Sequence, residues 1–190
     1  MSINLLETIQ KNLGFPALHK IDPNTQEIKT SDSDPAEDRL SQAVIPSVLI
    51  ALYNFSTTQH GAEAILNDNL ADWKHEIFGN DQKEAILHIA SYAHKSAAIA
   101  QETVNAVTRE AVQIIRHELN GKETVQNVKT LLEDQRNIVL HYLPASVEIG
   151  KILNNTTFDD RTNKMEGPVS NLMHAIGNVF SSSDDTSPRK

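Results

Sequence analysis

Apolar residues recur every three or four positions along most of the chain, a spacing that predicts amphipathic helices. The first stretch covers residues 3–13, with Ser2 as the expected N-cap and Gly14 as the stop, and residues 15–20 form a short second piece. No strand-like alternation of useful length occurs. We therefore expect an all-α, multi-helix bundle of about seven to nine helices.

The longest apolar run, residues 43–55, reads AVIPSVLIALYNF and contains Pro46. A proline inside a helix removes a backbone hydrogen bond, so we expect the helix to kink or restart at Ile45. Residues 142–153, YLPASVEIGKIL, repeat this order of bulky residues, proline and apolar residues, with Pro144 in the proline position. The pattern predicts two proline-led helices in the core. The residues expected to be buried in the first of them are Val48, Leu49 and Leu52.

Further helices are indicated by start signals and by apolar stripes. The predicted N-caps are Asp34 (followed by Pro35 and a capping-box Glu37), Asp81 (with Glu84) and Ser96. Short helices are expected over 60–68 and 70–78, and a long one from Ser96 to Gly121. The stripe of that long helix is Ala97, Ala100, Val104, Val107, Ala111 and Ile114. A second long helix is expected after Gly121, and its apolar stripe is Val125, Val128, Leu131, Leu132, Ile138, Val139 and Tyr142.

These elements divide the chain into three parts. Residues 1–153 are expected to form a helical domain, interrupted by a polar linker loop at about 21–33. Residues 154–180 are expected to form a loop and a C-terminal amphipathic helix over 168–180. Residues 181–190 have the composition of a disordered tail.

Composition narrows the classes of function. The 190 residues carry a net charge of −8 without a dense Lys/Arg stripe, which argues against nucleic acid as a partner. Cysteine is absent, which excludes disulfides, thiolate zinc sites and Cys-held iron–sulfur clusters. The apolar runs are shorter than the ~20 residues of a membrane span. The first residues lack a basic flank and include Glu7, so we expect no signal peptide and a cytoplasmic location.

The eight histidines raise the question of a metal or proton site. Glu84 and His88 are spaced to share one helix face, and His94 is close in sequence. They could hold a metal or a proton, but a surface ion pair is the simpler interpretation. His141 precedes a predicted helix end, where an imidazolium interacts well with the helix dipole.

The sequence lacks the short motifs that mark common catalytic and metal sites. The sequence has no Glu-x-x-His, no Gly-x-Ser-x-Gly and no P-loop. We therefore predict no catalytic residue, no cofactor and no metal site, with Glu84, His88, His94 and His141 as the weak metal candidates.

Several short stretches resemble the YidB-like bacterial domain of unknown function 937. They include Pro46, Pro144, the stretch Gly61-Ala62-Glu63-Ala64 and the turn Ile77-Phe78-Gly79, spread over residues 3–153. The resemblance implies a helical fold and supplies no catalytic residues.

Two functions from different classes remain. The first is a non-enzymatic, cytoplasmic helical module that binds a protein partner or a second copy of itself, with binding of a small apolar ligand as a variant. The alternative is a helical-bundle metal-binding protein or enzyme that uses histidine and carboxylate ligands. A further hypothesis makes the helix at 168–180 an arm that docks onto a partner or a membrane surface.

Overall fold

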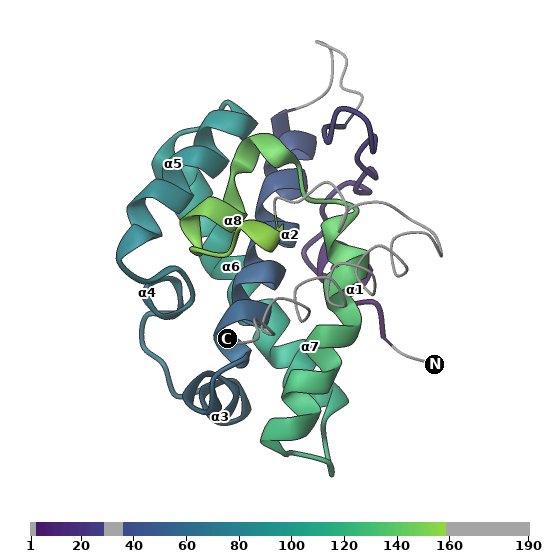
Figure 1. Ribbon diagram of the computed structural model, residues 1–190, viewed down its shortest axis with the longest axis vertical. Coiled ribbons are helices and arrows are strands. Elements are labelled where there is room, and N and C mark those ends of the chain that lie inside the picture. The colour runs from purple at the N-terminus through teal and green to yellow at the C-terminus, as the bar shows by residue number, and fades with distance from the viewer. Residues whose placement is uncertain (1–2, 29–35, 159–190) are drawn as a thin grey trace, which may run out of the picture.

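The computed structural model describes residues 3–28 and 36–158 of the chain (Figure 1). These residues form α-helices and short 3-10 turns, with no strand among them, which confirms the all-α bundle. The helices are α1 (Leu5–Asn12), α2 (Ala36–Ser56), α3 (Gln59–Asn67), α4 (Trp73–Phe78), α5 (Gln82–Ala93), α6 (Ala97–Glu118), α7 (Val125–Leu140) and α8 (Ile149–Ile152). The turns are η1 (Gly79–Asp81), η2 (Ala145–Val147) and η3 (Thr156–Phe158).

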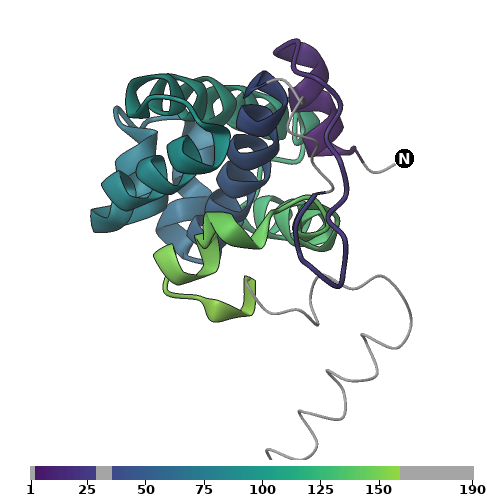
Figure 2. The same cartoon turned by 90° about the horizontal axis from the view of Figure 1, so that it is seen from above.

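Helix α2 forms the centre of the bundle. Figures 1 and 2 show it between α5 and α6 on one side and α1 and α7 on the other. Its most extensive contact is with α7, followed by α5 and α6. Every residue from 40 to 52 is buried, including the expected Val48, Leu49 and Leu52. The longest apolar run therefore lies in the core over residues 43–52.

The two prolines behave differently from the sequence-based expectation. Helix α2 continues through Pro46 without a restart at Ile45, so that prediction was wrong. A proline inside a helix costs about 3 kcal/mol, whereas burying a single Val, Leu or Ile contributes about 1.5–3 kcal/mol. A helix buried on all sides has many such residues, so tertiary packing outweighs the local cost. The second proline-led helix was also wrong, because Pro144 precedes the turn η2 and the one-turn helix α8.

Helix caps follow the sequence signals in part. Ser96 caps α6 as predicted, accepting a hydrogen bond from the backbone of Ile99. The cap of α1 is Asn4, because its side chain accepts from the backbone of Glu7, and Ser2 lies outside the described residues. Asp81 makes no side-chain cap, because the turn η1 leads into α5. The signals at Asp34 and Pro35 lie outside the described residues.

The predicted stripes are largely buried. In α6 the stripe residues from Ala100 to Ile114 are buried, whereas Ala97 is exposed at the first turn. In α7 the prediction was wrong for Ile138, whose exposed fraction is 38%. Residues 15–20 do not form the expected short helix.

Two buried glutamines hold the irregular parts of the chain. The side chain of Gln42 in α2 accepts from His19 N at 2.8 Å and donates to the carbonyl oxygens of His19 (3.0 Å) and Tyr142 (2.6 Å). The side chain of Gln135 in α7 accepts from Leu5 N at 3.0 Å and donates to Ile3 O at 2.9 Å. Buried amides of this kind satisfy backbone groups that no helix satisfies.

The described part of the predicted linker is docked rather than free. Ile21 N donates to His141 O at 2.9 Å, and Ala145 N donates to Gln26 O at 3.0 Å. The chain beyond residue 153 also contributes to the core, since Phe158 is 1% exposed and its ring meets that of Tyr53 edge-on at 5.9 Å. The helix expected at 168–180 and the tail at 181–190 lie outside the described residues.

Within residues 3–28 and 36–158, no single helix combines the length and hydropathy of a membrane span. Helices α2 and α3 reach that threshold only when counted together, and they are bent by 118° relative to each other.

Truncation of Leu52 tests the central position of α2. Leu52 is 0% exposed, so Leu52→Ala should lower the free energy of unfolding by about 2–5 kcal/mol, measured by urea denaturation. Leu87 in α5 is 59% exposed and provides the matched control, because Leu87→Ala should change stability by no more than about 0.5 kcal/mol. Equal effects of the two changes would contradict the central role of α2.

Substitution of Gly61 tests how closely α3 approaches the end of α2. A Cβ at this position would overlap the backbone carbonyl of Phe55, which has no room to move within the helix. Gly61→Ala should therefore destabilise the protein by about 1–3 kcal/mol, as overpacking does elsewhere. Thermal denaturation measures the effect. The exposed Glu63 lies two residues further along α3 and provides the control, because Glu63→Ala should have a much smaller effect in the same assay. An unchanged melting temperature for Gly61→Ala would show that the approach is looser.

Candidate functional site

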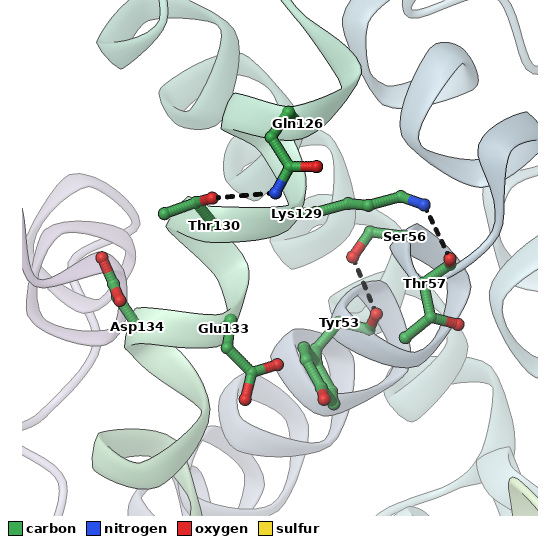
Figure 3. A pocket seen from close by; sticks show the side chains of 8 residues that line it. All are labelled: Tyr53, Ser56, Thr57, Gln126, Lys129, Thr130, Glu133 and Asp134. Atoms are coloured by element: carbon green, nitrogen blue, oxygen red, sulfur yellow. Dashed lines mark hydrogen bonds between the residues drawn. The ribbon is translucent and has the colours of Figure 1, made fainter.

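A groove lies between the end of α2 and one face of α7 (Figure 3). Its volume is about 370 Å³. Residues that line it from the α2 side are Tyr53, Ser56 and Thr57, and those from α7 are Gln126, Lys129, Thr130, Glu133 and Asp134. The α7 residues recur at three- and four-residue intervals, which places them on one helix face.

At one end of the groove, the polar side chains already form hydrogen bonds within the protein. Lys129 Nζ donates to the carbonyl oxygen of Thr57 at 2.9 Å, which ties α7 to the α2–α3 connection. Gln126 Nε2 donates to Thr130 Oγ1 at 3.4 Å, and Ser56 Oγ donates to Tyr53 O at 2.8 Å. These groups therefore shape the groove and offer little unmet hydrogen-bonding capacity.

The other end carries exposed negative charge beside an aromatic ring. Glu133 and Asp134 are both exposed, and Figure 3 shows the carboxylate of Glu133 next to Tyr53. Burial raises the pKa of Tyr53 to about 12, and the Glu133 carboxylate adds to this while Arg136 opposes it. The Arg136 guanidinium carbon lies 5.8 Å from the Tyr53 ring centroid and 5.7 Å from that of Phe158. This corner of the protein thus already accommodates one guanidinium against its aromatic rings.

A second hollow region surrounds Tyr92 on α5. One hollow of about 320 Å³ is lined by Glu27, Ile28, Arg39, Ser91, Tyr92 and His94, and an adjoining one of about 230 Å³ by His88, Ser91, Tyr92 and Ser146. The Tyr92 hydroxyl is buried and makes no hydrogen bond to any residue that the structure describes. Burial raises the pKa of Tyr92, the charge of Glu27 raises it further, and Arg39 lowers it. The side chain of Glu27 is itself engaged, accepting from Ser146 N at 2.8 Å.

Of the four histidine and carboxylate candidates, the structure brings two together. Glu84 Oε1 lies 3.8 Å from His88 Nε2, one helical turn away as the spacing predicts. The other ring nitrogen, Nδ1, lies 3.5 Å from Glu148 Oε2 and 3.2 Å from Val147 O. His88 therefore joins α5 to the turn before α8.

The other two candidates lie apart from this pair. His94 is the C-cap of α5, exposed at the edge of the larger hollow, and His141 is the C-cap of α7. Within the part of the chain that the structure describes, no three His, Cys, Asp or Glu side chains are arranged to hold a metal ion.

Sequence reasoning missed Tyr53, Glu148 and Tyr92 as site residues. Tyr92 follows His88 by four positions and shares its helix face, a signal that periodicity could have provided. Tyr53 and Glu148 meet their partners only through tertiary packing, and no local pattern marks them.

No family model matches the chain, and no curated protein or solved structure matches it either.

Titration of Tyr53 tests the electrostatics of the groove. Because the folded state favours the neutral hydroxyl, its pKa should be about 12 rather than 10.0, and the fold should lose stability as the pH rises between these values. Tyrosine Cζ resonances in NMR report the value, with Tyr53→Phe providing the assignment. Glu133→Gln should lower the pKa of Tyr53, whereas Asp134→Asn should have a smaller effect. Equal shifts from the two changes would contradict the assigned role of Glu133.

Proposed function

We propose that this chain is a non-enzymatic interaction module whose α2–α7 groove binds a Lys- or Arg-bearing segment of a protein partner. The observation that carries the proposal is the end of the groove where the exposed carboxylate of Glu133 lies beside Tyr53, with the exposed Asp134 also among the lining residues. A guanidinium can pair with a carboxylate through two hydrogen bonds and can stack on an aromatic ring. The position of the Arg136 guanidinium over the Tyr53 ring supports the second of these contacts.

The charge of the whole chain supports the same class of partner. A net charge of −8 attracts basic segments and increases their rate of encounter. It also disfavours nucleic acid, and we propose a cytoplasmic location for the module. The relation to the YidB-like family stays a prediction that implies a helical fold without catalytic residues.

A pair of short peptides tests the groove. The probe is an acetylated Gly-Arg-Gly amide, and its neutral control replaces arginine with citrulline, which keeps the shape and removes the charge. In titrations followed by NMR of backbone amides, the arginine peptide should shift α7 resonances around Glu133, and the citrulline peptide should not. The shifts should weaken with added salt, because the contact is partly exposed.

Charge-neutralising variants locate the contact. Glu133→Gln and Asp134→Asn should each weaken the binding of the arginine peptide, whereas Glu102→Gln, an exposed change on α6, should leave it unchanged. Equal binding of the citrulline peptide, or an equal loss from Glu102→Gln, would overturn the proposal. A stoichiometric transition metal in protein purified without an affinity tag would also overturn it, in favour of the metal-binding alternative.

A further inference from the structure

The turn between α6 and α7 contains Asn120-Gly121, the one Asn-Gly pair in the sequence. Asn120 is exposed, and its backbone N donates to His117 O at 3.2 Å. Gly121 adopts a positive φ of +78°, and a Cβ built there would meet no atom within 4 Å. The turn therefore presents a short polar side chain next to an unhindered backbone nitrogen.

The side chain of Asn120 is not held in place. Its carboxamide makes no hydrogen bond within the described part of the chain. The neighbouring backbone N–H of Gly121 donates to Glu123 Oε1 at 3.0 Å. This hydrogen bond is the main cause that lowers the pKa of Glu123, so the acceptor is ionised near neutral pH.

We propose that Asn120 is a site of spontaneous covalent modification by deamidation. The Gly121 backbone nitrogen attacks Cγ of Asn120, the C–N bond to the side-chain amide breaks, and ammonia leaves. The carboxylate of Glu123 is positioned to accept the proton of the Gly121 nitrogen. The departing side-chain nitrogen takes up one proton in turn, so it leaves as ammonia and the Glu123 carboxylate is regenerated. The product is a five-membered succinimide. Water then adds to either carbonyl carbon of the ring, and ring opening leaves aspartate or isoaspartate at position 120. These reaction steps require no oxidant and no cofactor.

The geometry favours Asn120 over Asn127, an asparagine at the start of α7. A glycine after asparagine leaves the nitrogen free of a neighbouring Cβ, so the ring can close with little steric hindrance. Asn127, by contrast, donates a hydrogen bond from its side-chain nitrogen to Lys122 O at 2.8 Å. It also precedes Val128, whose side chain is branched at Cβ. Asn127 thus serves as an internal comparison within the same protein.

The modified turn leads directly into α7, the helix that lines the groove. A new carboxylate at position 120 lies just after the C-terminus of α6, where helix carbonyls concentrate negative charge, and close in sequence to Glu118 and Glu123. Isoaspartate in addition inserts a methylene into the backbone of the turn. Both products should loosen the start of α7, whether or not the groove binds a partner.

Ageing of the intact protein tests the proposal. After incubation at neutral pH and physiological temperature, tryptic digestion releases the peptide from His117 to Lys122 for mass spectrometry. Its mass should rise by the difference between a hydroxyl and an amino group, and its chromatographic peak should split into two isomers. The peptide containing Asn127 should stay unchanged. An unmodified 117–122 peptide, or equal modification of Asn127, would overturn the proposal.

Variants separate the parts played by the three residues. Asn120→Gln should abolish the change, because its longer side chain closes a ring much less readily. Gly121→Ala should slow it several-fold, and Glu123→Gln should also slow it while leaving the turn intact. If Gly121→Ala impairs folding, Glu123→Gln still tests the mechanism. An unchanged rate in Glu123→Gln would overturn the role assigned to that carboxylate.

Discussion

The complete burial of α2 is the constraint on which the rest of the structure depends. Residues 40–52 are all buried, so neighbouring elements must cover every side of this helix. No single helix can do so, and α1, α5, α6 and α7 are distributed around it (Figure 2). The same burial explains why Pro46 is tolerated inside the helix: a break there would expose apolar residues on both sides of it. The position of each surrounding helix is thus set by the need to cover α2.

Covering a helix on all sides leaves irregular chain pressed against the core, and its backbone groups must be satisfied there. Gln42 and Gln135 meet this need from two different helices. Gln42 connects the backbone at His19 with that at Tyr142, which brings the loop before α2 against the chain that follows α7. The hollows around Tyr92 form where this loop, α5 and the turn η2 meet. A polar residue inside an apolar helix therefore organises a surface feature of the protein.

The sequence predicted those features that depend on neighbours three or four residues apart. The apolar stripe of α6 and its cap at Ser96 are local in this sense, and both are present. The roles of Pro46 and Pro144 depend on what surrounds each segment, so their similar sequences lead to different structures. The groove depends on which faces of α2 and α7 meet, and periodicity does not reveal that pairing. Glu133 and Asp134 accordingly resemble any solvated helix face in the sequence.

Helix α7 shows how the core and the groove are linked. Its buried face, with Val128, Leu132 and Val139, packs into the bundle, and the adjacent face presents Lys129 and Glu133 to the groove. A rotation of α7 that improved one face would displace the other, because both belong to one rigid helix. Lys129 ties this helix to the end of α2 through Thr57 O. The spacing of the groove therefore follows from the packing of the core, and the same contacts that stabilise the fold hold Glu133 beside Tyr53.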